Sequence, residues 1–149
     1  MARLRLPFLK GAMPDMTTYL VKRVENALSG LYPKESWEHV LRVRKLAMEI
    51  AKAEKLDSES AEVVELAALM HDLAYSESPA WVDHATKSAK MAREMLSSYD
   101  VPVQRIDRVC ECIVSHSFAS AASPRRLEAK IIFDANSLEL IGPVGILRL

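Results

Sequence analysis

Hydrophobic residues recur along this chain every three and four positions, which is the period of an amphipathic helix. The stretch that begins at Val40 is an example, because Val43, Leu46, Ala47 and Ile50 follow it at these steps. The same period predicts six helices, over about residues 17–28, 33–55, 58–72, 83–98, 102–115 and 126–141. The sequence shows no strand-like alternation, so we expect an all-α fold, a single compact bundle of about six helices.

Residues that favour helix ends mark several of these boundaries. Gly30 follows the first helix, and Asp57 stands where the third helix needs an N-cap. Pro102 fits the first turn of the fifth helix, and Gly142 with the proline after it breaks the sixth. The boundaries therefore agree with the periodicity.

The last helix carries an aspartate, Asp134, within an otherwise apolar segment. We expect its inward face to be formed by Leu127, Ile131, Ile132, Ala135 and Leu138. An unpaired carboxylate among core residues destabilises a fold, so this position predicts that Asp134 meets a cation.

The length of 149 residues suits one domain with a real core. We expect residues 1–15 to be an N-terminal arm, because basic residues interrupt its apolar ones and Met13 and Met16 could also initiate translation. Residues 16–149 would then form the helical domain.

Composition excludes some classes of partner. Twenty basic and twenty acidic residues give a formal net charge of zero, so no global charge attracts nucleic acid or a membrane surface. No apolar run approaches the roughly 20 residues of a membrane span. Cys110 and Cys112 are too few and too close to indicate a disulfide framework, so we expect reduced thiols that fill the core of a cytoplasmic protein. A homo-oligomer stays possible.

The four histidines all fall at or near predicted helix ends, at His39, His71, His84 and His116. Asp72 follows His71 directly, at the end of an apolar run. Burying such an ionisable pair costs several kcal/mol unless it is hydrogen-bonded or metal-bound. Imidazole and carboxylate together are donors for divalent transition metals, whereas a bundle without a metal would have to stabilise them in another way.

Read in order, the histidines, the His-Asp pair and the later aspartate resemble the HD superfamily of metal-dependent phosphohydrolases, in particular its small prokaryotic members. The resemblance runs from about Trp37 to Ile146. The segments that carry it are residues 37–40, 69–73, 83–85, 115–118 and 128–135. It implies an HD-domain-like fold and hydrolysis of a small phosphate ester, such as a nucleotide or a related phosphomonoester or diester, by metal-activated water.

The resemblance also implies roles for individual residues. The shared metal ligands would be His39, His71, Asp72 and Asp134, with His71 and Asp72 as the catalytic pair. The positions of His84 and His116 match residues that serve a second metal or the substrate phosphate in some members. Imidazoles favour manganese, iron, cobalt, nickel or zinc, as one or two ions, and the two oxygens of Asp72 could bridge a pair.

Four basic residues are candidates for neutralising the phosphate, although each could equally be a solvated surface charge. They are Lys87, Arg125, Arg126 and Lys130.

The sequence departs from its relatives after Asp134. Asn136, Ser137 and Glu139 occupy places where small members commonly have an aspartate, an arginine and another acidic residue. The chain also ends at Leu149, where relatives often add further helices. These differences leave open an alternative, a catalytically weakened HD domain that acts as a metal- and nucleotide-binding regulatory module.

Overall fold

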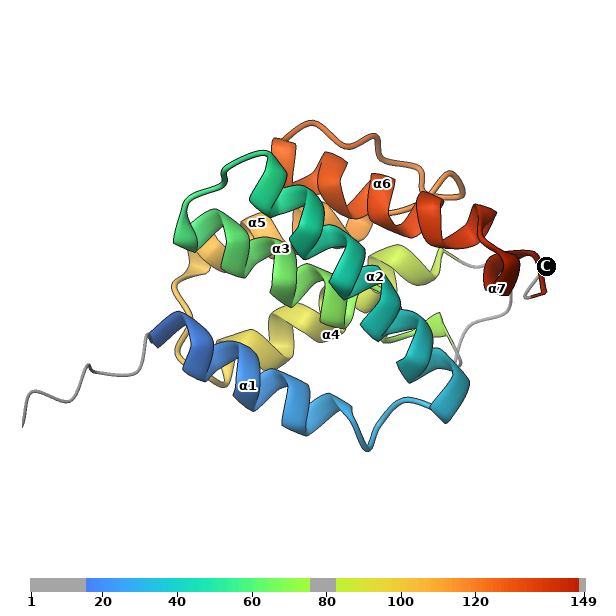
Figure 1. Ribbon diagram of the computed structural model, residues 1–149. Coiled ribbons are helices and arrows are strands. Elements are labelled where there is room, and N and C mark those ends of the chain that lie inside the picture. The colour runs from blue at the N-terminus through green and yellow to red at the C-terminus, as the bar shows by residue number, and fades with distance from the viewer. Residues whose placement is uncertain (1–15, 76–82, 148–149) are drawn as a thin grey trace, which may run out of the picture.

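The computed structural model describes residues 16–75 and 83–147, so the expected N-terminal arm lies outside the described residues. Within these ranges the chain is helical and contains no strand, which confirms the all-α prediction (Figure 1). The helices are α1 (Met16–Leu28), α2 (Lys34–Ala53), α3 (Ser58–Met70), α4 (His84–Ser97), α5 (Val103–Val114), α6 (Leu127–Ile141) and α7 (Pro143–Ile146).

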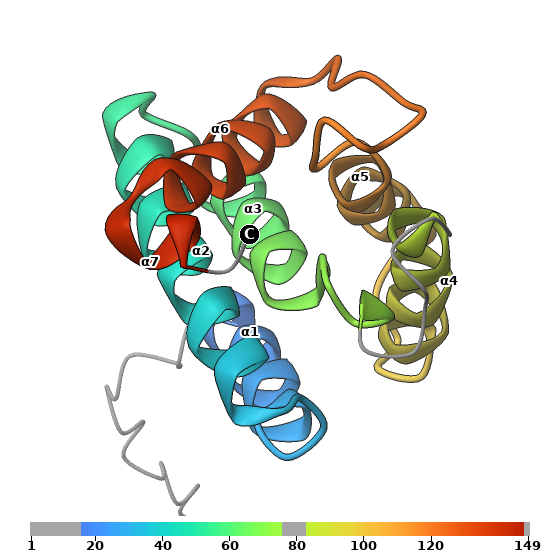
Figure 2. The ribbon, with the colours of Figure 1, turned by 90° about the vertical axis from the view of Figure 1, so that its right-hand side faces the viewer.

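Helix α3 forms the centre of the bundle. It contacts α1, α2, α4, α5 and α6, and Figure 2 shows it between the α2–α6 side and the α4–α5 side. Every residue from Leu66 to Met70 is fully buried. A helix that is apolar all round lies either in a core or in a membrane. The complete burial of this segment makes α3 a core helix. No helix in the described ranges has the length and apolarity to cross a bilayer.

The inward faces of the surrounding helices largely follow the sequence pattern. Val40 and Val43 of α2 are fully buried, as is Val109 of α5. Cys110 and Cys112 are buried free thiols, as predicted, and burial raises the pKa of both. The apolar period therefore identifies most of the residues that pack against α3.

Helix α6 is the exception. Ile131, Ile132 and Ala135 are buried as predicted, but Leu127 and Leu138 are 45% and 47% exposed, so their expected inward orientation is wrong. Apolar residues occupy most of the circumference of this helix, and in such a helix the period does not identify the stripe that faces the core.

Two helices end without the glycine that commonly closes a helix. Lys55 after α2 and Asp100 after α4 take up the left-handed conformation, with φ of 56° and 57°. The N–H of Leu56 then donates to the carbonyl of Ala51 at 3.1 Å, which closes the last turn of α2. Asp57 begins α3 as its N-cap, as predicted, and its side chain accepts a hydrogen bond from the backbone N–H of Ser60, in the first turn, at 2.8 Å.

The break at Gly142 is followed by the short helix α7, which the sequence pattern did not predict. Pro143 is its first residue, where a missing N–H costs nothing. Gly145 lies directly against the backbone carbonyls of Glu139 and Leu140, and a Cβ at this position would collide with them. Glycine therefore allows α7 to fold back onto the end of α6.

Two leucine substitutions test this assignment of buried and exposed faces. Leu66→Ala removes a fully buried side chain, so the free energy of unfolding should fall by about 2–5 kcal/mol. Leu138→Ala makes the same chemical change on the exposed face of α6, and its effect should stay within about 0.5 kcal/mol. Urea unfolding followed by circular dichroism measures both. Equal losses would contradict the orientation of α6.

Candidate metal centre

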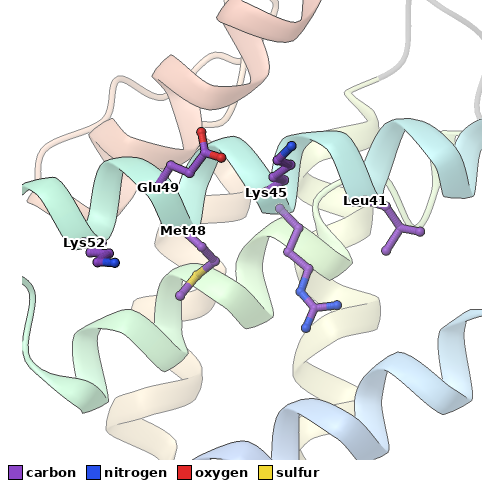
Figure 3. A pocket seen from close by; sticks show the side chains of 6 residues that line it. Leu41, Lys45, Met48, Glu49 and Lys52 are labelled. Atoms are coloured by element: carbon purple, nitrogen blue, oxygen red, sulfur yellow. The ribbon is translucent and has the colours of Figure 1, made fainter.

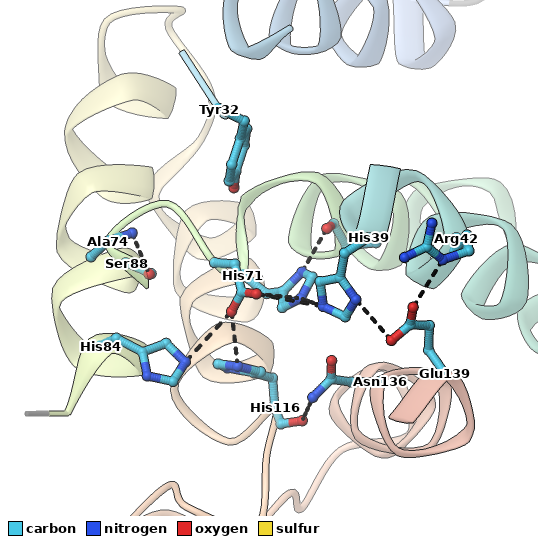
Figure 4. Close-up of polar contacts among 12 residues, drawn as sticks. Tyr32, His39, Arg42, His71, Ala74, His84, Ser88, His116, Asn136 and Glu139 are labelled. Carbon is cyan, nitrogen blue, oxygen red and sulfur yellow. Dashed lines mark hydrogen bonds and ion pairs between the residues drawn. The ribbon is translucent and has the colours of Figure 1, made fainter. Parts of the chain in front are cut away.

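Five polar side chains from four parts of the fold meet at one end of the bundle (Figure 4). His39 lies in the second turn of α2, and His71 is the C-cap of α3 with Asp72 after it. His84 is the first residue of α4, and His116 follows the C-cap of α5. The structure thus brings together five of the six residues that the sequence nominated as metal ligands.

The carboxylate of Asp72 lies in the middle of this group. Its Oδ2 atom is 3.5 Å from Nε2 of His39 and 3.6 Å from Nε2 of His71. Its Oδ1 atom is 3.5 Å from Nε2 of both His84 and His116. Each carboxylate oxygen therefore faces two imidazoles, and all four imidazoles present the same ring nitrogen.

Backbone hydrogen bonds fix the tautomers of two of these rings. Nδ1 of His71 lies 2.8 Å from the carbonyl oxygen of Ala68, and Nδ1 of His116 lies 2.7 Å from that of Ile113. A carbonyl oxygen only accepts, so Nδ1 carries the proton and donates in both rings. When these rings are neutral, Nε2 is then an unprotonated acceptor that points at Asp72.

His39 is oriented by side chains instead. Its Nδ1 atom lies 2.9 Å from Oε2 of Glu139, whose other oxygen accepts from Nε of Arg42 at 2.9 Å. Its Nε2 atom is 3.4 Å from Nε2 of His71. Arg42 was not singled out from the sequence, and Glu139 was noted only because relatives commonly have an acidic residue at that position. Their signal was spacing, because Arg42 lies three residues after His39 and Glu139 three after Asn136.

The surroundings of the cluster lower the pKa of both His71 and Asp72. Burial, the largest effect, lowers the pKa of His71 to about 4, although Asp72 opposes it. Burial alone would raise the pKa of Asp72, but His71, His116 and His84 together hold it well below its usual range. Near neutral pH the centre thus places an ionised carboxylate against the unprotonated Nε2 atom of His71, an arrangement that repels unless a cation lies between them.

The spacing of these atoms suits a metal ion. Two ligands about 2.1 Å from a common ion are about 3.4 Å apart at tetrahedral angles. The donor atoms form two groups, His39 with His71 and Asp72, and Asp72 with His84 and His116, each with its atoms within 4.8 Å of one another. Asp72 belongs to both groups. The donor set therefore fits a divalent metal.

Asp134 is the nominated ligand that the structure does not bring to the centre. Its side chain is exposed on α6, whereas Asn136, two residues on, is buried and donates from Nδ2 to the carbonyl of His116 at 3.4 Å. Residues two apart on a helix point about 200° away from each other. The apolar neighbours of Asp134 thus lie on the buried side of α6, and its carboxylate faces solvent without needing a cation.

The four basic residues nominated for phosphate are all exposed: Lys87, Arg125, Arg126 and Lys130. Arg126 donates to Glu111 at 2.9 Å. Arg125 lines a cavity of about 610 Å³ together with Ser115, the residue before His116. Of these two arginines, Arg125 therefore shares a cavity with a neighbour of the cluster, while Arg126 is held in a surface ion pair.

A separate hollow of about 490 Å³ lies on the outer face of α2 (Figure 3). Its lining residues are Leu41, Arg44, Lys45, Met48, Glu49 and Lys52. Arg44 is held by Glu65 at 2.9 Å and by Glu25 at 3.1 Å. None of the lining residues belongs to the cluster around Asp72, so this hollow is distinct from the metal centre.

The chain is similar in structure to solved proteins. A predicted HD superfamily hydrolase from an uncultured Thermotogales bacterium is similar with a TM-score of 0.66 and 31% identity, over 88% of this chain and 72% of the other. The crystal structure of Bacillus subtilis YpgQ in complex with ADP is similar with a TM-score of 0.70 and 28% identity, over 90% of this chain and 65% of the other.

Sequence comparison leads to the same group of proteins. The uncharacterized protein YpgQ of Bacillus subtilis (strain 168) is 35% identical over 129 residues, which is 84% of this chain. The chain spans 60% of the length of that relative. The family model described as HD domain matches residues 36–141, which include all five residues of the cluster. The chain therefore belongs to the HD domain family.

Proposed function

We propose that this protein is a metal-dependent phosphohydrolase that acts on a small phosphate ester, a nucleotide or a related phosphomonoester or diester. The observation that carries the proposal is the carboxylate of Asp72 with two imidazole Nε2 atoms facing each of its oxygens at 3.5–3.6 Å. A phosphorylated substrate is supported by the ADP bound in the structure of YpgQ. Hydrolysis is supported by the Thermotogales relative, described as a hydrolase.

The residues of the cluster would hold a divalent transition metal, as one or two ions. Four imidazoles and a single carboxylate favour manganese, iron, cobalt, nickel or zinc over magnesium. Such an ion lowers the pKa of a bound water and polarises a phosphoryl oxygen. His39 and His71 are nearly inaccessible, whereas the side chain of His84 is 18% exposed. We therefore place the substrate on the His84 side of Asp72.

Residues near this side would orient the substrate. Tyr75 is half-exposed and contacts the ring of His84 edge-on, with ring centroids 5.3 Å apart. Arg125, through the cavity that it shares with Ser115, is the nominated cation that we favour for the phosphate. Lys87 lies in the first turn of α4, three residues after His84, and is the second candidate.

A regulatory module that binds metal and nucleotide without turnover is the second candidate function. Asn136, buried beside His116, leaves the cluster with one carboxylate of its own. The hydroxyl of Ser137 donates to the carbonyl of Phe133 at 2.7 Å, so it does not replace a guanidinium for the substrate. These two residues would reduce turnover more than they reduce metal binding.

Two aspartate variants test the ligand set. Asp72→Asn should weaken metal binding by more than the roughly 10–100-fold that loss of an outer partner costs, because it removes the donor common to both groups. Asp134→Asn should leave the affinity unchanged, since Asp134 faces solvent. Isothermal titration of manganese or zinc into the metal-stripped protein measures both. A loss at Asp134 equal to that at Asp72 would contradict the assignment.

A panel of nucleoside mono-, di- and triphosphates, with manganese, cobalt or nickel, tests the reaction. The wild-type protein should release a dephosphorylated product, and Asp72→Ala should slow this at least about a hundredfold, since the metal contributes several kcal/mol to the transition state. Wild-type rates equal to those of Asp72→Ala would refute a phosphohydrolase. Nucleotide-dependent thermal stabilisation without product would then support the regulatory module.

A further inference from the structure

The imidazole of His39 is held differently from those of His71 and His116. Those two rings donate from Nδ1 to a carbonyl three residues earlier in their own chain segment. The Nδ1 atom of His39 instead meets a carboxylate from another helix, that of Glu139, which lies 100 residues away in the sequence. This contact links α6 to the cluster through a side chain that is not one of its donors.

Glu139 is held in one orientation by two contacts from α2. Its Oε2 atom lies against His39, and its Oε1 atom accepts from Arg42 at 2.9 Å. His39 and Arg42 are three residues apart and so share a face of α2. The carboxylate is 3% exposed, whereas Arg42 is 37% exposed and lines a surface cavity of about 340 Å³ together with Glu139.

We propose that Glu139 is a positioning residue of the metal centre, held by Arg42, that keeps the proton of His39 on Nδ1 and directs its Nε2 atom toward Asp72. The proposal rests on the proposed metal-dependent function. A carboxylate accepts from Nδ1–H and does not donate, so it selects the tautomer whose Nε2 atom is free to bind a metal. Such a partner also makes the imidazole a stronger ligand.

Charge gives Glu139 a second effect. The cluster itself has one carboxylate, and the neighbouring buried residue of α6 that faces it is the neutral Asn136. Glu139 places a further negative charge behind His39, within one imidazole of the donor atoms. Arg42, on the other oxygen, cancels part of this charge, so Glu139 offsets the charge of a divalent ion only in part.

If Glu139 only stabilised the fold, its loss would leave the tautomer of His39 unchanged. The test therefore needs a measurement at the ring of His39. In the metal-free protein at mildly alkaline pH, the ¹⁵N chemical shifts of the His39 ring report which nitrogen carries the proton. Glu139→Ala should give a mixture of tautomers and metal binding weaker by about 10–100-fold. Glu139→Gln should fall between, because its amide oxygen still accepts from Nδ1–H. Arg42→Ala should weaken binding by less than Glu139→Ala.

The matched control is Glu65→Gln. Glu65 lies on α3 and accepts from Arg44 of α2 at 2.9 Å, so it forms a comparable carboxylate–guanidinium pair with the same helix away from the cluster. This variant should change neither the His39 tautomer nor the metal affinity. An equal loss of affinity in Glu65→Gln and Glu139→Gln would show that the effect is one of general stability and would overturn the positioning role.

The failure of this proposal is distinguishable from failure of the proposed function. Wild-type metal affinity and an unchanged His39 tautomer in Glu139→Ala would overturn the positioning role alone. A wild-type protein that binds no metal would overturn the metal-dependent function, while the ¹⁵N shifts would still test the tautomer. Should Glu139→Ala fail to fold, Glu139→Gln and Arg42→Ala carry the same measurements, and wild-type values in both would overturn the proposal.

Discussion

The contact between the Asp72 carboxylate and four imidazole Nε2 atoms is the constraint on which the rest of the site depends. Each oxygen of the carboxylate faces two Nε2 atoms at 3.5 or 3.6 Å. Hydrogen bonds to Ala68 and Ile113 hold the Nδ1 protons of His71 and His116 away from these contacts. Acceptors that face one another in a protein interior repel strongly, because the low dielectric strengthens the interaction. A shared cation makes the same arrangement attractive.

The fold satisfies this constraint by bringing helix ends together. The last carbonyls of a helix lack N–H partners within it, so they can accept hydrogen bonds from side chains. Ala68 lies in the last turn of α3 and Ile113 in the last turn of α5, and each accepts from the histidine just past the helix end. Carbonyls in the last helical turns are thus used to orient ligands, and that of Ile113 also accepts from the backbone N–H of His116 at 3.3 Å. This requires a buried end, and for His71 the apolar C-terminal segment of α3, Leu66 to Met70, provides it.

Sequence reasoning could recover most of this arrangement but not all of it. The helical period and capping residues locate six helices, and the order of histidines and His71-Asp72 identifies the residues that converge. The period could not set the rotation of α6, whose apolar residues cover most of its circumference. Asp134 was therefore assigned to the buried side, while the buried polar residues of α6 are Glu128, Asn136 and Glu139.

Other misses have local causes. Lys55 and Asp100 adopt φ near 57° without a glycine to announce the helix end, because the surrounding backbone hydrogen bonds outweigh the modest strain of a single residue there. The four-residue helix α7 is shorter than the period can detect. Contacts between distant residues, such as that of His39 with Glu139, depend on how helices pack. Spacing places Glu139 on the same face of α6 as Asn136, but it does not show that this face meets His39.

The position of His39 explains why it needs a different partner from the other buried histidines. His39 lies inside α2, where the carbonyls one turn earlier accept from the helix's own N–H groups, so no unpaired carbonyl is at hand. An acceptor for its Nδ1 proton has to come from a neighbouring helix, and α6 packs against α2. A buried acceptor with its own cation, Glu139 with Arg42, meets this need. Helix α6 then acts on the centre through the ring of His39, and this follows from where on its helix His39 stands.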